Sequence, residues 1–329
     1  ECLSYVNQVS DEWEWYVDKI GRWVDFKNAY KTWDTKYMES VMWVFKQMYD
    51  KGYVYKGLRV SLYCPHCITP ISNFEVSMDG EENYKPVVEV SNVYKYELAN
   101  EKGTYFLAWS TTPWNKIVTP ALAVNPKLIY LKVKQNNEKY ILGKETLSQL
   151  NGEYEILEEI KGSDLIGMKF IGHYDFYKIE EGKQAFVVIP GDFVTETDGT
   201  GIVTIAAYGE DDLVVMKENN IQITLHLADD GTLKEFVPNW GGMHYLKVNA
   251  LVNEDLAQRG LVYKEEILEH RVPHCWRCHT RLIHAPQNAW FVDVQKLKPR
   301  MEETNKQVYW FPEHFGEGRY LKSMQSAPD

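Results

Sequence analysis

This sequence has no long hydrophobic run, little cysteine and no excess of positive charge. No apolar stretch approaches the roughly 20 residues of a membrane-spanning helix, and no secretory signal is visible. The net charge of −11 over 329 residues argues against nucleic-acid binding driven by the whole surface. A hydrophobic fraction of 44% excludes a disordered chain. We therefore expect a cytoplasmic protein of two or three domains, without a membrane partner, whose contacts with any polynucleotide are local.

Four of the five cysteines lie in two Cys-x-x-Cys pairs, which residues 68–274 separate. Two such pairs are the usual ligand set of a structural zinc ribbon, where roughly 15–20 residues lie between them. We predict that one structural zinc ion is held by Cys64, Cys67, Cys275 and Cys278, and that the intervening residues are an insertion. Cys2 is left without such a partner, which suits a reducing compartment.

The energetics allow a zinc module that is split in this way. Lengthening the loop roughly tenfold costs about 2 kcal/mol of closure entropy, whereas a structural zinc site contributes on the order of 10–16 kcal/mol. The residues alone leave three alternatives open. These are haem attachment at residues 275–279 (Cys-Trp-Arg-Cys-His), a thioredoxin-like redox pair, and replacement of a cysteine ligand by His274, His279 or His284.

The periodicity of apolar residues changes along the chain. A helix is predicted between Asp34 as its N-cap and Gly52 at its end, with an apolar face that we expect to pack in a core, formed by Met38, Val41, Met42, Phe45, Met48 and Tyr49. The polar stretch 79–83 marks a boundary. Strand-like runs follow at 105–109, 128–133, 184–189 and 202–205, which suggests a barrel-like β-domain. A helix at 247–256, stopped by Gly260, is expected to lead directly into the second cysteine pair.

Three polar segments inside the predicted β-domain could carry chemistry, and each also has an ordinary structural explanation. Residues 109–115 (Trp-Ser-Thr-Thr-Pro-Trp-Asn) offer hydroxyls that can hold a water and an oxyanion, or simply form a Ser/Thr turn. Residues 198–204 form a tight turn into a strand and not a dinucleotide fingerprint, because Thr204 replaces the third glycine. Residues 209–212 (Gly-Glu-Asp-Asp) can anchor a cation or form an exposed acidic loop.

In this order between the cysteine pairs, the segments resemble the editing insertion of isoleucyl-tRNA synthetase. The resemblance covers nearly the whole chain and also rests on the motifs at 21–26 (Gly-Arg-Trp-Val-Asp-Phe), 63–67 (Tyr-Cys-Pro-His-Cys), 121–126 (Ala-Leu-Ala-Val-Asn-Pro), 199–203 (Gly-Thr-Gly-Ile-Val) and 273–278 (Pro-His-Cys-Trp-Arg-Cys). Valyl- and leucyl-tRNA synthetases share the architecture. The Thr-Thr-Pro-Trp turn and the Cys-Trp-Arg-Cys pair favour the isoleucine enzyme.

The resemblance implies a mixed α/β fold, with a β-barrel-like editing domain inserted into a split zinc ribbon and flanked by helices. The implied parts are a helical segment connecting to a catalytic body (1–62), a zinc module (63–83 and 262–295), the editing β-barrel domain (84–261) and a segment returning to the catalytic body (296–329). Neither His-Ile-Gly-His nor Lys-Met-Ser-Lys-Ser is present. ATP would therefore be used only by the rest of a parent enzyme, and we expect the chain itself to be monomeric.

The resemblance also implies proofreading, the hydrolysis of valine from mischarged tRNA for isoleucine. The isoleucine enzyme itself exemplifies the need, because one methylene gives only about 150-fold selection. Matched by position, Thr111, Thr112 and Asp212 would be catalytic, and Asp212 would also pair with the α-ammonium of the substrate. The substrate pocket would further include Ser110, Trp114, Asn115 and Thr204. No covalent nucleophile or metal is expected at the reaction centre.

The sequence departs from the family pattern within this site. Thr204 stands where the family has a histidine that shapes the side-chain pocket, and Ala206-Ala207 stands where Ala-Pro is usual. The loop before Asp212 is one residue short, and Ser110 and Asn115 replace threonines. A second hypothesis is therefore a module that binds and positions the tRNA end after its editing activity has decayed.

Overall fold

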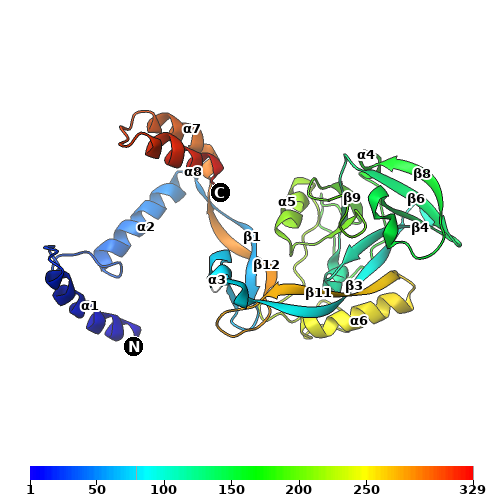
Figure 1. Ribbon diagram of the computed structural model, residues 1–329, viewed down its shortest axis with the longest axis horizontal. Helices are drawn as coiled ribbons and strands as arrows, with labels where there is room; N and C mark the ends of the chain where they lie inside the picture. Colours follow the sequence, from blue (N-terminus) through cyan, green and yellow to red (C-terminus); the bar gives the residue numbers. More distant parts are fainter. Residues whose placement is uncertain (79, 329) are drawn as a thin grey trace. The chain divides into compact units, whose positions relative to one another are not determined.

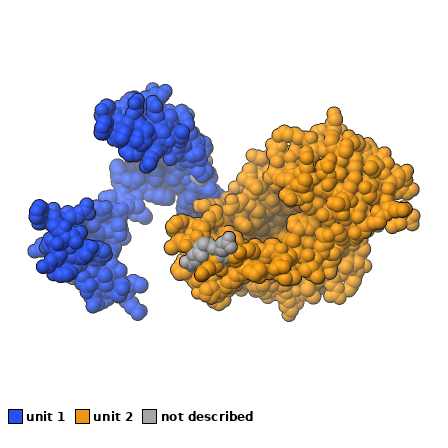
Figure 2. Space-filling model, viewed as in Figure 1, with its two compact units in different colours: residues 1–57, 289–329 blue, residues 58–288 orange. Residues whose placement is uncertain are grey.

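The computed structural model describes residues 1–78 and 80–328. They form two compact units, unit 1 of residues 1–57 and 289–329 and unit 2 of residues 58–288 (Figure 2). Asp79, which begins the polar stretch predicted as a boundary, lies outside the described residues. Among the helices described, none has the length and apolar character needed to cross a membrane.

Unit 1 is built mainly of helices: α1 (Cys2–Lys19), α2 (Thr35–Asp50), α7 (Val294–Asn305), a π-helical turn η4 (Phe315–Tyr320) and α8 (Leu321–Ser326). The ends of α2 are as predicted, with Asp34 at the N-cap position and Gly52 just past the end at a φ of +71°. The predicted core packing of its apolar face is wrong for this chain. No described residue of α2 is buried, and Met42 is 68% exposed. On this face Phe45 and Tyr49 contact the ring of Trp290 edge-on.

Unit 2 is dominated by a nine-stranded sheet that curls on itself (Figure 1). The strand order is β8 (Glu155–Lys161), β6 (Ile129–Gln135), β7 (Glu138–Gly143), β4 (Glu101–Ser110), β10 (Val203–Ile205), β5 (Ala121–Val124) and β9 (Val187–Pro190), and β3 (Tyr84–Leu98) joins β4 to β11 (Val262–Pro273). The four predicted strand runs correspond to β4, β6, β9 and β10. The mixed α/β, barrel-like fold class is confirmed.

A three-stranded sheet carries the cysteines. It consists of β12 (Ile283–Val292), β1 (Val54–Cys64) and β2 (Thr69–Pro70), with the short helix α3 (Asn73–Ser77) and the 3₁₀ turn η1 (Gly80–Asn83) beyond it. Residues 54–62 were expected in a helical segment and are instead a strand. Their β-branched and aromatic residues suit a half-buried sheet better than a helix.

Strands β3 and β11 of the large sheet form a long antiparallel ribbon that extends from the sheet to the cysteine-bearing part of unit 2 (Figure 1). Pairing runs from Val262 opposite Tyr94 to Pro273 opposite Tyr84. The ends of the insertion between the cysteine pairs are therefore adjacent, which lowers the entropic cost of closing so long a loop. Residues 262–273 were expected in the zinc module and belong to this sheet, and the helix at 247–256 leads into β11 instead of directly into the second cysteine pair.

The main core lies under the large sheet and is rich in aromatic rings. Tyr94, Tyr96, Phe106 and Tyr130 are fully buried there. Helix α6 (Tyr245–Gln258) covers this core with a face of Tyr245, Val248, Val252 and Leu256, spaced as one helix face requires. The remaining short elements of unit 2 are η2 (Pro113–Val118), η3 (Lys144–Gln149), α4 (Gly162–Leu165) and α5 (Glu210–Glu218).

Candidate functional site

The two cysteine pairs converge as predicted. The sulfurs of Cys64, Cys67, Cys275 and Cys278 all lie within 4.8 Å of one another. Two of these residues are buried and two are half-buried, so the cluster is largely shielded from water. Four thiolates in this arrangement fit a tetrahedral soft-metal site, in which the metal–sulfur distance is about 2.3 Å. The cysteine cluster can therefore hold one metal ion.

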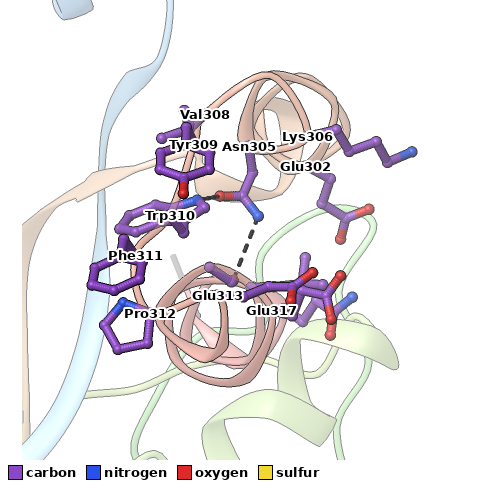
Figure 3. Close-up of a pocket in the computed structure, with 13 residues that line it drawn as sticks. Glu302, Asn305, Lys306, Val308, Tyr309, Trp310, Phe311, Pro312, Glu313 and Glu317 are labelled. Atoms are coloured by element: carbon purple, nitrogen blue, oxygen red, sulfur yellow. Dashed lines mark hydrogen bonds between the residues drawn. The ribbon is translucent and has the colours of Figure 1, made fainter.

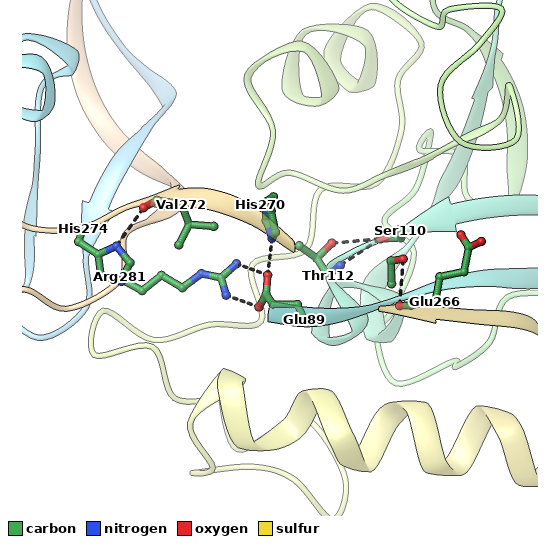
Figure 4. Close-up of polar contacts among 9 residues, drawn as sticks. Glu89, Ser110, Thr112, Glu266, His270, Val272, His274 and Arg281 are labelled. Atoms are coloured by element: carbon green, nitrogen blue, oxygen red, sulfur yellow. Dashed lines mark hydrogen bonds and ion pairs between the residues drawn. The ribbon is translucent and has the colours of Figure 1, made fainter. Parts of the chain in front are cut away.

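The two cysteine turns share a backbone conformation but differ in their hydrogen bonds. The residue after each pair, Ile68 or His279, has a left-handed backbone with a φ of 52° or 60°. The amide of Cys67 donates to the Cys64 sulfur at 3.3 Å, and the amide of His279 donates to the Cys275 carbonyl at 2.8 Å. The predicted alternative ligand His274 instead has its Nδ1 2.9 Å from the carbonyl oxygen of Val272 (Figure 4). Among the described residues, the metal-binding group consists of cysteines alone.

The predicted polar site lies at one edge of the large sheet. Strands β4 and β10 are parallel neighbours, and Val203 pairs with Trp109. The carboxyl ends of parallel strands meet at the same edge. The turn after β4 and the loop after β10 therefore start side by side, with Ser110 next to Thr204 in the strand register. We call this region the site edge.

The hydroxyls of residues 110–112 form a connected turn at the site edge. The Ser110 and Thr112 hydroxyl oxygens lie 3.2 Å apart, and the Thr112 amide donates to the Ser110 oxygen at 3.2 Å (Figure 4). The side-chain amide nitrogen of Asn115 donates to the Thr112 hydroxyl at 3.4 Å, while the side-chain oxygen Oδ1 of Asn115 is buried without a partner in the described part of the chain. Thr111 is half-buried, and none of the hydrogen bonds among residues 1–78 and 80–328 uses its hydroxyl. The turn is thus ordered but keeps polar atoms available.

Trp114 belongs to the core beneath this turn. Its side chain is only 4% exposed and lies edge-on to Tyr208 and Tyr245, at ring-centre distances of 4.8 and 5.7 Å. Its amide donates to the Asn249 side chain of α6 at 3.2 Å, and His226 Nε2 lies 3.1 Å from its carbonyl oxygen. The structure thus places this indole under the hydroxyl turn, where it anchors η2 on the core.

Thr204 has a neighbour that sequence reasoning missed. The ammonium of Lys116, on η2, donates a hydrogen bond of 2.6 Å to the Thr204 hydroxyl. Lys116 is 1% exposed, and burial lowers its pKa to about 7, although the charge of Asp212 acts in the opposite direction. The signal available in the sequence was a lysine placed directly before the apolar pair Ile117 and Val118.

Asp212 lies in the first turn of α5 and folds back toward β10. Its carboxylate accepts a hydrogen bond of 3.0 Å from the Ala206 amide and lies close to the Cα of Gly209, where a larger side chain would collide with it. Burial raises its pKa to about 6, and both the Ala206 hydrogen bond and the charge of Lys116 oppose that change. Its neighbour Asp211 is exposed. The site edge thus brings together hydroxyls, an amine and a carboxylate.

A separate polar network lies on the β3–β11 ribbon. The carboxylate of Glu89 accepts hydrogen bonds from Arg281 and lies 2.8 Å from His270 Nε2 (Figure 4). Arg281 follows the second cysteine pair, so this network joins the cysteine-bearing part to the ribbon. Burial raises the pKa of Glu89, but hydrogen bonds from Arg281 and His270 outweigh it and leave the pKa lowered.

Unit 1 has a surface hollow of about 870 Å³ between α7 and the segment that follows it (Figure 3). Its lining includes Trp310, whose ring nitrogen donates to Asn305 at 2.9 Å, and the exposed Tyr309 and Phe311. None of the residues predicted for the site lines it.

The chain is similar in sequence to proteins of a known family. The family model of class I tRNA synthetases (I, L, M and V) matches residues 1–329. The chain is 40% identical over 331 residues to the isoleucine–tRNA ligase of Clostridium tetani and 38% identical over 335 residues to that of Chlamydia abortus. These alignments cover 100% of this chain but only 31% and 32% of the relatives, so the chain spans about a third of their length.

Two solved structures also align with part of the chain. The crystal structure of GlLeuRS-CP1 has 15% identity and a TM-score of 0.44 over 54% of this chain and 99% of its own. The editing domain of the cytosolic leucyl-tRNA synthetase of P. knowlesi has 14% identity and a TM-score of 0.40 over 53% of this chain and 95% of its own.

Proposed function

This chain belongs to the class I tRNA synthetase family, and from that premise we propose that its site edge hydrolyses the ester of mischarged valyl-tRNA for isoleucine. The observation that carries the proposal is the parallel pairing of β4 and β10. It brings the turn after β4, with its hydroxyls that can hold a water, next to Thr204 on β10, and the carboxylate of Asp212 accepts from the Ala206 amide just after that strand. The 40% identity to an isoleucine–tRNA ligase supports isoleucine as the cognate amino acid.

Each group at the site edge has a role in this proposal. Asp212 pairs with the α-ammonium of the valyl group, and the partly buried setting strengthens that contact. With a pKa of about 6, Asp212 is largely ionised at neutral pH. Ser110, Asn115 and Thr204 line the pocket. Trp114 supports the turn from the core below it.

The chemistry is the addition of water to an ester. The hydroxyls of Thr111 and Thr112 hold the water and donate to the carbonyl oxygen as it gains negative charge. The water oxygen bonds to the carbonyl carbon, the bond from that carbon to the ribose oxygen breaks, and the ribose oxygen takes up a proton from the water and becomes a hydroxyl. The products are free valine and uncharged tRNA. No side chain of this protein becomes covalently modified.

The cysteine cluster is proposed to hold zinc in a structural role. Four thiolates without a histidine or a carboxylate leave no open position for a substrate, which is typical of structural sites. When bound, the ion would cross-link the two cysteine turns. That cross-link would fix the base of the β3–β11 ribbon, on which the large sheet is carried.

The proposal is tested by a deacylation assay. The chain is incubated with valyl- and isoleucyl-tRNA for isoleucine, and release of the amino acid is followed. We expect release of valine only, a loss of at least about 100-fold in Asp212→Ala, and no change in Asp211→Ala, the exposed neighbour. Valine release that equals the buffer rate, or survives in Asp212→Ala, contradicts the proposal. Release from tRNA for valine or leucine instead would favour a valyl or leucyl enzyme.

A second function is a module that binds the tRNA end with decayed editing. It is favoured by the contact of Lys116 with Thr204, which places a cation in a pocket proposed to receive another cation. In that case Thr204→His raises valine release from near the buffer rate. A high rate in the unmodified chain excludes it.

The remaining activities of such an enzyme would belong to other parts of it. The relatives extend well beyond the region that this chain matches. We propose that activation of isoleucine with ATP and charging of the tRNA take place there, in the cytoplasm, and that the charged 3′ end of the tRNA moves to the site edge for proofreading.

A further inference from the structure

Lys116 is a buried amine that the proposed hydrolysis does not use. It is 1% exposed, and its ammonium lies 2.6 Å from the Thr204 hydroxyl and 5.5 Å from the ring centre of Tyr94. None of the ion pairs formed within residues 1–78 and 80–328 includes it. A hydroxyl and an aromatic face stabilise a buried ammonium much less than a contacting carboxylate does. The charged form of Lys116 is therefore poorly compensated.

The groups whose contact or charge acts on Lys116 come from three elements and one loop. Asp212 on α5 is the carboxylate that acts on it. Tyr94 on β3 is neutral, with a pKa that burial raises above its ordinary value. His173 lies in the segment after α4, and burial lowers its pKa to about 3, so it is neutral as well. Thr204 on β10 does not titrate. Asp212 and Lys116 are thus the two groups here whose charge changes near neutral pH.

We propose that Lys116 is a charge gate, so that the site edge accepts a cationic aminoacyl group only after Lys116 has lost its proton. The inference rests on the proposed role of Asp212. A protonated Lys116 already partly neutralises Asp212, and two ammonium groups close together in poorly hydrated surroundings repel each other. A neutral Lys116 leaves Asp212 free for the substrate and can accept a hydrogen bond from Thr204.

The gate predicts a proton release on binding. Burial lowers the pKa of Lys116 to about 7 in the free protein, and an added cation lowers it further by repulsion. Binding of a cationic ligand below neutral pH therefore expels a proton from the site. Lys116 acts through the charge of the pocket and need not touch the reacting atoms, so it is a positioning residue.

The experiment measures binding of two non-hydrolysable valyl-adenosine analogues to the full chain by calorimetry. Both have an amide in place of the ester; one keeps the α-ammonium and the other has a neutral α-hydroxyl. At about pH 6 we expect Lys116→Met to bind the cationic analogue at least about tenfold more tightly than the unmodified chain, and at about pH 8 the two to bind alike. Comparison at one pH cancels the titration of the analogue itself.

Three controls separate the possible outcomes. The α-hydroxyl analogue should bind both proteins equally, and Lys127→Met, which alters a 78% exposed lysine, should change nothing. On binding the cationic analogue at about pH 6, the unmodified chain should release more protons than Lys116→Met, as measured in buffers of different ionisation enthalpy, because Asp212, whose pKa is about 6, releases protons in both. If Asp212→Asn weakens binding of the cationic analogue, but Lys116→Met neither tightens that binding nor reduces the proton release, the gate is wrong and the proposed function stands. If the unmodified chain binds neither analogue, or Asp212→Asn has no effect on binding, both the gate and the proposed function are wrong.

Discussion

At the scale of single residues, the site edge contains two ionisable groups, Lys116 and Asp212, whose pKa values burial shifts toward neutral pH. Burial favours the neutral form of both, which lowers the pKa of Lys116 to about 7 and raises that of Asp212 to about 6. Perturbed groups of this kind gather at functional sites. The pair therefore supports the site edge as the place where the chemistry occurs.

The first prediction concerns how much the burial of Lys116 lowers the free energy of unfolding. Its pKa is lower in the folded chain than the ordinary value of 10.5, so between about pH 7 and 10 the unfolded chain binds more protons and stability rises with pH. In Lys116→Met this rise should shrink by on the order of 3–5 kcal/mol, and the variant should be more stable at neutral pH. Urea unfolding across this range checks it. The exposed control Lys127→Met should follow the unmodified chain, and an unchanged slope in Lys116→Met contradicts the prediction.

At the scale of elements, the β3–β11 ribbon decides how the cysteine-bearing part meets the large sheet. At the base of the ribbon, the carboxylate of Glu89 contacts His270 on β11 and Arg281, which follows the second cysteine turn. The side chains of Glu89 and Arg281 are mostly buried, so this pair is less exposed to solvent and salt than a surface ion pair.

Glu89→Gln provides the second prediction. Because the pKa of Glu89 is lowered in the folded chain, its contribution is present above its unfolded pKa and is lost as the pH falls through the folded value. The variant should lose about 1–3 kcal/mol at neutral pH and little at strongly acidic pH, as measured by chemical unfolding. Glu159→Gln, which breaks an exposed pair with Lys144, is the matched control and should lose less than about 1 kcal/mol. Equal losses in the two variants would show that the ribbon pair is an ordinary surface contact.

A third prediction concerns the close packing of α4 against the loop after β5. A methyl group on Gly162 would overlap the carbonyl oxygen of Asn125, which cannot rotate away as a side chain can. Gly162→Ala should therefore destabilise the chain by about 1–3 kcal/mol. Gly318→Ala, where the nearest atom is 3.8 Å away, should change stability much less. Thermal unfolding of the two variants makes the comparison, and similar midpoints would count against the packing argument.

At the scale of the whole chain, the cysteine cluster joins segments that are far apart in the sequence. The fourth prediction is one zinc ion per chain by metal analysis, with loss of the ion in Cys275→Ser. Because a structural site adds its binding energy to folding, removal by a chelator should lower the unfolding midpoint of unit 2 and added zinc should restore it. Cys2→Ser, at the exposed free cysteine, should keep the metal. Two zinc ions per chain, or none, would contradict a single shared site.

Features that follow from local pattern were predictable from the sequence. The ends of α2 at Asp34 and Gly52, and the helix stopped by Gly260, follow from capping rules and periodicity. The two Cys-x-x-Cys pairs indicated a shared metal site because two such pairs are the usual ligand set of a zinc ribbon. The apolar face of α2 shows the limit of such rules, since periodicity says which residues share a face but not what covers it.

The sequence by itself determined which local structures form and which residues can carry chemistry: the cysteine turns, the hydroxyl turn at 110–112 and the acidic start of α5. Only the tertiary structure decided that β3 pairs with β11 and β4 with β10, and that Lys116 lies buried against Thr204. The reason is physical. Turns and caps depend on neighbouring residues, whereas strand pairing and burial depend on residues far along the chain, and a lysine is ordinarily exposed until the fold encloses it.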